Sequence, residues 1–128
     1  MLKPTFEEFK EKSREGNLIP VYKEILADLD TPVSAYMKIR ESEYSFLLES
    51  VEGGEKWARY CFLGFDPYVI ISIKRNEVTL EKKGQIESIV IKKGNPLVGL
   101  KEILAQYQPV EVERLPRFSG GAVGFVSY

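Results

Sequence analysis

Cys61 is the one candidate thiol nucleophile in this 128-residue sequence, since the chain contains a single cysteine. A reactive thiol is usually activated by a neighbouring histidine, and the chain has no histidine. This absence also removes the commonest general base and the commonest metal ligand. Cys61 lies in the apolar run Tyr60-Cys61-Phe62-Leu63, which is typical of core packing. We therefore expect Cys61 to be structural.

Other catalytic patterns are missing as well. The glycine-rich run at 120–124 (Gly-Gly-Ala-Val-Gly) lacks the Lys-Ser/Thr pair of a phosphate-binding loop and the first-strand context of a dinucleotide-binding fold. Carboxylates are numerous but scattered, with no cluster at metal-ligand spacing. We therefore expect no catalytic residue, no metal ligand and no cofactor within this chain.

The charge balance and hydropathy exclude two classes of partner. Eighteen basic residues against 19 acidic ones give a net charge of −1, which offers no electrostatic drive toward nucleic acid. No apolar stretch approaches the roughly 18 residues that a membrane helix needs. The N-terminus opens into charged sequence and does not resemble a signal peptide. The sequence predicts a cytoplasmic protein without membrane or nucleic-acid contacts.

The first third of the chain predicts two helices with a strand between them. Thr5-Phe6-Glu7-Glu8 fits a capping box, and Gly16 is expected to end the helix that follows. Residues 18–22 suggest a strand that places its proline at an edge or bend. Asp30-Thr31-Pro32 then predicts the start of a second helix, which extends to about Arg40.

A series of hairpins occupies the middle of the chain. Tyr44 to Val51 is almost continuously apolar, which predicts a strand buried on both faces. Residues 52–55 (Glu-Gly-Gly-Glu) predict a turn, and Trp57 to Phe65 the returning strand. Three more strands are expected at 68–74, 78–82 and 86–92, with turns at 75–76 and 83–84.

A third helix is expected to begin at Asn95-Pro96 and to end near Tyr107, with four aliphatic residues on one face: Leu97, Leu100, Ile103 and Leu104. Hairpins flanked by helices, without strict βαβ alternation, indicate an α+β fold with a mostly antiparallel sheet. The length suits one domain.

The last eleven residues, 118–128, predict an apolar, glycine-rich strand, and the sequence stops inside it. Natural domains usually finish with exposed polar residues, so we expect a truncated chain. A strand without all its partners is a template for pairing, and we expect self-association through residues 122–128.

Three ordered motifs resemble component I of anthranilate synthase, the large, chorismate-binding subunit. Residues 46–64 contain the run Phe-Leu-Leu-Glu-Ser-Val-Glu-Gly-Gly-Glu-Lys-Trp, continued by Arg-Tyr-Cys-Phe-Leu-Gly. Residues 20–36 are similar to the opening of the same family, and residues 116–125 (Pro-Arg-Phe-Ser-Gly-Gly-Ala-Val-Gly-Phe) match its next landmark. The motifs extend over nearly the whole chain.

The resemblance implies that residues 1–128 are the N-terminal domain of an anthranilate synthase and belong to the fold shared with aminodeoxychorismate synthase. The whole enzyme is a lyase of tryptophan biosynthesis that makes anthranilate and pyruvate from chorismate and ammonia. A glutamine amidotransferase subunit, component II, supplies the ammonia. Chorismate and magnesium bind to a larger C-terminal domain that this chain lacks, so the fragment alone is expected to be inactive.

The resemblance also implies a feedback-inhibition site for tryptophan, centred on the Leu-Leu-Glu-Ser strand at 47–50. A bound amino acid needs acceptors for its ammonium, donors for its carboxylate and an apolar wall for its ring. Glu49, Ser50 and Arg59 supply the polar groups, and Pro20 and Leu48 can supply the wall.

A tight turn centred on Gly53-Gly54 would pair residues whose numbers sum to 107. Ser50 then opposes Trp57 and shares a face with Arg59, roughly 7–8 Å away, while Glu49 points to the other face.

Other interpretations remain open at this stage. Glu49-Ser50 also fits the polar end of a strand entering a turn, and Trp57 fits a core anchor. Arg59 also fits a cation paired with some carboxylate, and relatives place lysine at its position. Aminodeoxychorismate synthase and a stand-alone amino-acid-binding module are the alternative functions.

Overall fold

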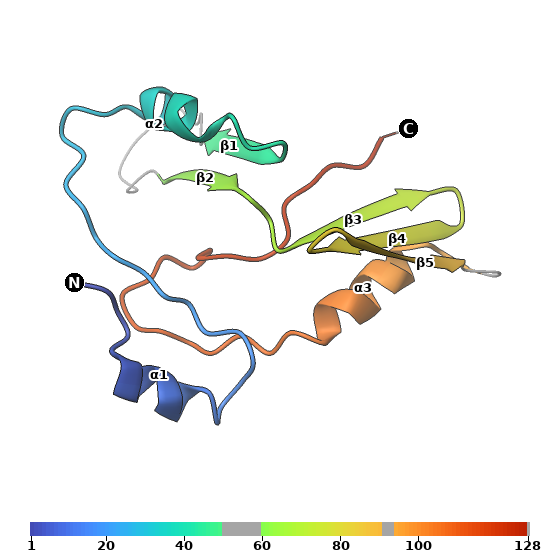
Figure 1. Cartoon of the computed structure of the whole chain (residues 1–128), viewed down its shortest axis with the longest axis horizontal. Helices are drawn as coiled ribbons and strands as arrows, with labels where there is room; N and C mark the ends of the chain where they lie inside the picture. Colours follow the sequence, from blue (N-terminus) through green and yellow to red (C-terminus); the bar gives the residue numbers. More distant parts are fainter. Residues whose placement is uncertain (50–59, 91–93, 128) are drawn as a thin grey trace. The chain divides into compact units, whose positions relative to one another are not determined.

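The computed structural model describes residues 1–49, 60–90 and 94–127, which form an α+β structure (Figure 1). Within these residues there are three helices and two small antiparallel sheets, one of two strands and one of three. The predicted fold class is therefore confirmed. The chain divides into two compact units, Met1–Ile25 with Leu97–Tyr128 and Leu26–Pro96, and each is described by itself.

The first unit begins with helix α1 (Phe6–Lys12), and its predicted capping box is confirmed. The Thr5 hydroxyl accepts a hydrogen bond from the Glu8 N–H at 3.3 Å, and the Glu8 carboxylate accepts one from the Thr5 N–H at 2.8 Å. These reciprocal bonds satisfy two backbone donors that a helix start otherwise leaves open.

Gly16 does not end this helix, contrary to the prediction, because α1 finishes at Lys12 with Ser13 as its C-cap. Gly16 has a different structural reason. A Cβ atom at position 16 would overlap the carbonyl oxygen of Gln108 and lie 2.8 Å from Cγ2 of Val110. A glycine lets the chain pass this close to the later segment.

The predicted strand at 18–22 is wrong. Two isolated bridges replace it: Leu18 pairs with Pro109, and Tyr22 pairs with Lys3. Pro20 lies between these bridges and has no N–H to donate, so a continuous ladder cannot form across it.

Helix α3 (Leu97–Ala105) follows the predicted start but ends near Ala105, before the expected Tyr107. Its buried positions are Gly99 and Ile103, while Leu97 and Leu104 are 46% and 41% exposed. The four-residue aliphatic face is therefore only partly used for packing in this unit.

The predicted C-terminal strand is also wrong for the described residues, because 118–127 contain no strand. Extended backbone becomes a strand only where a neighbour completes the ladder, and Gly120 and Gly121 adopt φ of 157° and 145°, a region that favours glycine. Phe125 is 93% exposed. Self-association through this segment stays a prediction.

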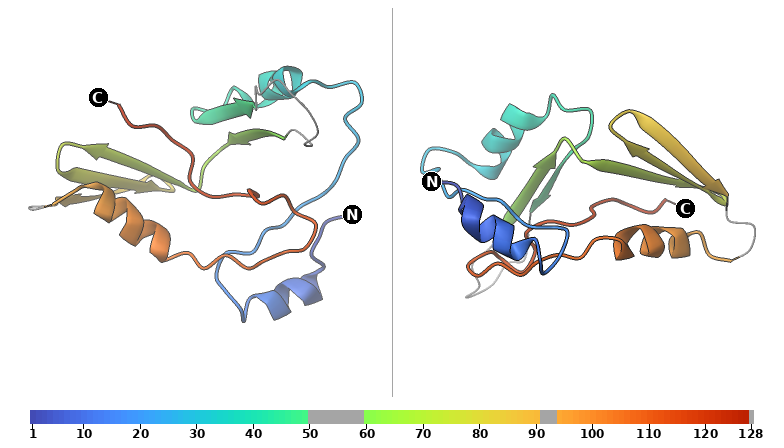
Figure 2. Two further views of the ribbon diagram at one scale, coloured as in Figure 1. Left: turned by 180° about the vertical axis from the view of Figure 1, so that it is seen from behind. Right: turned by 60° about the horizontal axis from the view of Figure 1, so that its bottom comes forward.

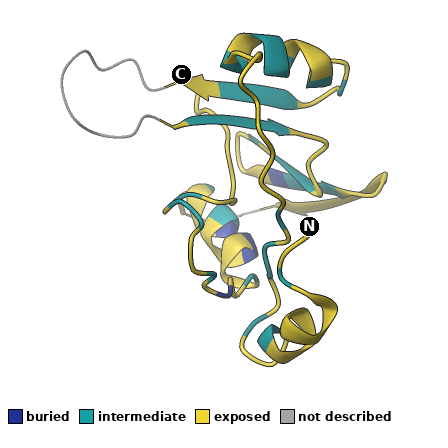
Figure 3. Cartoon of the chain, turned by 90° about the vertical axis from the view of Figure 1, so that its left-hand side faces the viewer, coloured by how far each residue is buried: buried dark blue, intermediate teal, exposed yellow. Residues whose placement is uncertain are grey.

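The second unit begins with helix α2 (Pro32–Ile39), which is capped by Thr31 and has the predicted proline in its first turn. It packs against a hairpin of β1 (Ser45–Glu49) and β2 (Cys61–Phe65). The hydroxyls of Tyr36 and Ser45 form a hydrogen bond of 3.1 Å between helix and strand. The β1 residues are half-buried or exposed, so the prediction of burial on both faces is wrong (Figure 3).

The register of this hairpin differs from the prediction. Observed partners include Ser45 with Phe65 and Phe46 with Gly64, so their numbers sum to 110 and not to 107. Gly64 explains the fit, because a Cβ atom there would overlap the ring of Phe46. The ring therefore occupies the space that any other residue at 64 would fill, and this contact favours the observed pairing.

A second sheet contains β3 (Val69–Lys74), β4 (Glu77–Lys82) and β5 (Gln85–Val90) in that order (Figure 2). The predicted strands and both turns are confirmed within residues 68–90. Lys83 and Gly84 both have positive φ, 51° and 76°, as expected for a tight two-residue hairpin turn. Val78, on the central strand of the sheet, is 1% exposed.

Candidate functional site

Two of the candidate tryptophan-site residues, Leu48 and Glu49, lie at the end of β1. Leu48 pairs with Phe62 and Glu49 with Cys61. Neighbouring residues of a strand point to opposite faces, so Glu49 and Leu48 lie on different faces, as the sequence predicted. Both side chains are exposed, and the exposed fraction of Leu48 is 45%.

The face that carries Leu48 is apolar and aromatic. Ser45 contacts α2. Because side chains alternate along a strand, Phe46 and Leu48 lie on the other face of the hairpin, opposite that helix. Phe62 shares this face with Leu48, and its ring stacks with that of Tyr60 at a centroid distance of 6.2 Å. Tyr60 and Phe62 were not among the residues predicted from the sequence, although their period-two spacing is visible there.

The other candidate residues are placed differently. Ser50 and Arg59 lie outside the described residues, as does Trp57. Their shared face therefore stays a prediction, although the register from which it was derived is wrong in the described ladder. Pro20 belongs to the first unit, where it is half-buried between the two bridges.

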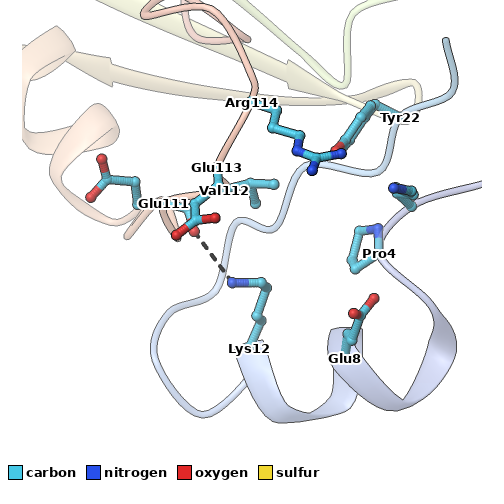
Figure 4. A pocket seen from close by; sticks show the side chains of 9 residues that line it. Pro4, Glu8, Lys12, Tyr22, Glu111, Val112, Glu113 and Arg114 are labelled. Atoms are coloured by element: carbon cyan, nitrogen blue, oxygen red, sulfur yellow. Dashed lines mark hydrogen bonds between the residues drawn. The ribbon is translucent and has the colours of Figure 1, made fainter.

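A polar pocket of about 660 Å³ lies within the first unit (Figure 4). Three segments form it. They are the N-terminus with α1, the residue Tyr22, which pairs with Lys3, and residues 111–114. Its lining includes three cations and three carboxylates, and the full set is Lys3, Pro4, Glu8, Lys12, Tyr22, Glu111, Val112, Glu113 and Arg114.

Hydrogen bonds fix several of these groups. The Lys12 ammonium donates to the Glu111 carbonyl oxygen at 3.4 Å, and the backbones of Lys3 and Tyr22 exchange hydrogen bonds of 2.8 and 2.7 Å. The backbone hydrogen bond from Thr5 lowers the pKa of Glu8, with smaller contributions from Lys3 and Lys12. Glu8 is therefore a charged group that already has a partner.

A second pocket, of about 670 Å³, lies within the other unit beside the start of β1. Its walls are mostly apolar, with Tyr44 and Phe65 among them. At its edge the Asp66 N–H donates to the Ser42 hydroxyl at 3.2 Å, and Asp66 adopts a positive φ of 52°. This end of the hairpin is opposite to the end that carries Glu49.

In residues 1–49, 60–90 and 94–127, no three His, Cys, Asp or Glu side chains gather closely enough to hold a metal ion. No helix in the same ranges has the length and apolar character needed to cross a membrane.

Comparison with known proteins gives a consistent result. Anthranilate synthase component 1 of Acetivibrio thermocellus is 40% identical over 128 residues, which cover 100% of this chain and 26% of that protein. The Synechocystis protein of the same name is 45% identical over 130 residues, again 100% of this chain and 25% of the relative. The Pseudomonas aeruginosa protein is 41% identical over 95% of the chain.

The chain is similar to anthranilate synthase component 1 over 95–100% of its length. The predicted resemblance is thus confirmed, and the chain spans about a quarter of the length of the curated relatives that it matches. Neither a family model nor a solved structure matches it.

Proposed function

We propose that this chain is the N-terminal domain of an anthranilate synthase component I and carries part of its tryptophan-feedback site. The observation that supports this most strongly is sequence identity of 37–45% with component 1 proteins over 95–100% of the chain but only 25–26% of those proteins. The motifs at residues 20–36, 46–64 and 116–125 support the same assignment.

The whole enzyme, in this proposal, is a cytoplasmic lyase of tryptophan biosynthesis that converts chorismate and ammonia to anthranilate and pyruvate. Component II supplies the ammonia from glutamine. We place the chorismate and magnesium ligands in the part of the enzyme beyond this chain. The role of residues 1–128 is regulatory and structural, and the chain alone is inactive.

The tips of β1 and β2 suit the binding of an aromatic amino acid. Glu49 can accept hydrogen bonds from the ammonium, and Ser50 and Arg59 can donate to the carboxylate. Leu48 offers an exposed apolar surface on the same face as the stacked Tyr60 and Phe62 rings. Such a surface matches an indole ring.

Exposed apolar side chains give independent support for a larger protein. Among the described residues only Val78, Ile103 and Val110 are buried hydrophobics. On β5, Ile86 and Val90 are 66% and 62% exposed. A domain that must fold alone usually buries more of its apolar surface than this.

The assignment is tested by assaying the chain with chorismate, magnesium and ammonium and by sequencing its gene beyond Tyr128. We expect no anthranilate fluorescence from the chain, and an open reading frame that continues for about three times its length, since it covers 26% of a relative. Anthranilate production by the chain alone, or a stop codon directly after Tyr128, would contradict the proposal.

A further inference from the structure

We propose that Tyr68 is a nucleophilic modification site, whose phenol oxygen accepts an acyl group from an activated acyl donor. The inference uses only residues of the second unit and is independent of the proposed tryptophan site. Its basis is a geometry. The ammonium nitrogen of Lys82 lies over the Tyr68 ring at 4.7 Å from its centroid, and that of Lys83 lies at 5.8 Å. Two cations beside one phenol stabilise the phenolate, which is the form that attacks a carbonyl carbon.

The turn between β4 and β5 explains how two consecutive lysines reach one ring. Tyr68 directly precedes Val69, which pairs with Lys82 across β3 and β4. Adjacent residues of a strand point to opposite faces, which would separate Lys82 from Lys83. Lys83 lies in the turn with a positive φ of 51°, so the alternation ends there. Both ammonium groups therefore lie over the same ring.

The electrostatics of the phenol agree with this geometry. A hydrogen bond from Lys82 lowers the pKa of Tyr68, and the charges of Lys82 and Lys83 lower it further, against an opposing effect of desolvation. Asp66 lies two residues earlier in the chain, and Glu81 pairs with Ile70 in the ladder. Among the described residues, neither of these carboxylates contributes to the shift of the Tyr68 pKa.

Tyr68 is also accessible to a reagent, because 55% of the residue is exposed. In the transfer, the phenolate oxygen attacks the carbonyl carbon of the donor. A carbon–oxygen bond forms as the bond from that carbon to the leaving group breaks, and the leaving group takes up the proton that the phenol releases. An acyl imidazole is a donor of this class, and its leaving group departs as neutral imidazole.

The test is acetylation of the full chain with N-acetylimidazole near neutral pH, followed by mass spectrometry of the peptides over time. Hydroxylamine removes acetyl groups from tyrosine esters and not from lysine amides, so it identifies the tyrosine product. Tyr60 is the internal control, because it is 54% exposed but its ring stacks on Phe62. Tyr68 should react at least about threefold faster than Tyr60, because the gain in phenolate outweighs the weaker nucleophilicity of a stabilised anion. This difference should shrink as the pH approaches 10.0, the ordinary pKa of tyrosine, where both phenols ionise.

Lys82→Gln should lower the ratio of the Tyr68 rate to the Tyr60 rate by at least about twofold, since it removes a hydrogen bond and a charge from the phenolate. Lys74→Gln is the matched control, because it removes an exposed lysine at the other end of β3, and it should leave the ratio unchanged. A ratio below about threefold in the parent chain would overturn the proposal. An unchanged ratio in Lys82→Gln, or an equal fall in Lys74→Gln, would also overturn it.

Discussion

Replacing Gly64 with alanine should destabilise the second unit by about 2 kcal/mol, because the new methyl group would occupy the space of the Phe46 ring. A Cβ atom at position 64 would overlap Cε1 and Cζ of that ring and lie 2.9 Å from Cδ1. Overpacking of this kind costs about 1–3 kcal/mol. Phe46 is half-buried and can swing partly toward solvent, which places the expected cost near the middle of that range.

Urea unfolding followed by circular dichroism measures this cost as a change in the free energy of unfolding. Gly124→Ala is the matched control, because nothing lies within 4 Å of a Cβ atom there, and it should change stability by less than about 0.5 kcal/mol. In a Phe46→Ala background the Gly64→Ala cost should fall by at least about 1 kcal/mol. If Gly64→Ala costs no more than the control, or if Phe46→Ala gives no relief, the explanation of the register is wrong.

Two further predictions concern the first unit. The pKa of Glu8 is lowered by its bond from the Thr5 backbone, so its contribution to stability should be complete above its ordinary pKa of 4.5 and lost as the pH falls through the lower folded value. Thr5→Ala should lower the free energy of unfolding by about 1 kcal/mol at pH 7. Glu8→Gln should flatten the fall of the melting temperature with falling pH on the acid side. If that pH dependence is unchanged in Glu8→Gln, the Glu8 carboxylate contributes nothing to stability through the capping box. Arg114→Gly should raise the free energy of unfolding by about 1 kcal/mol, because glycine tolerates the positive φ of 71°. The gain would be measured as a higher urea midpoint. A lower midpoint would show that the arginine side chain stabilises the turn more than its backbone strains it.

Local sequence signals predicted the starts of the helices and the short hairpins well. The capping box at Thr5 depends on residues three apart, the helix start at Thr31 depends on the proline that follows it, and the Lys83-Gly84 turn depends on two adjacent residues. The information needed to form these features is contained within one turn of chain. Sequence patterns are reliable at that range because few other contacts compete.

The failures involve partners that lie far away in the sequence. The apolar pattern of residues 18–22 suggested a strand, but a ladder also needs donors, and Pro20 supplies none. The pattern at 118–127 is equally apolar, yet no neighbouring strand pairs with it among the described residues. The hairpin register depended on how the Phe46 ring fits over Gly64, which a count from the turn does not include.

The candidate site shows the same division. Alternation along β1 placed Leu48 and Glu49 on opposite faces, which needed only the period of a strand. The pocket around Arg114 was not predictable, because it joins Lys3 and Lys12 to a turn about a hundred residues later. The isolated bridges and the hydrogen bonds from Lys12 and Asn17 to the later segment bring its charges together.

The most direct test of the proposed function is tryptophan inhibition of the full-length enzyme carrying Ser50→Phe. A phenyl ring at the proposed site would fill the space of the ligand, so the tryptophan concentration for half-inhibition should rise by at least about tenfold, the equivalent of 1.4 kcal/mol. Uninhibited turnover of chorismate should stay within about twofold of the parent enzyme, because the catalytic ligands lie elsewhere in this proposal. Ser88→Phe, at an exposed position on β5, is the control. Unchanged inhibition in Ser50→Phe, or an equal loss in Ser88→Phe, would contradict a tryptophan site at the end of β1.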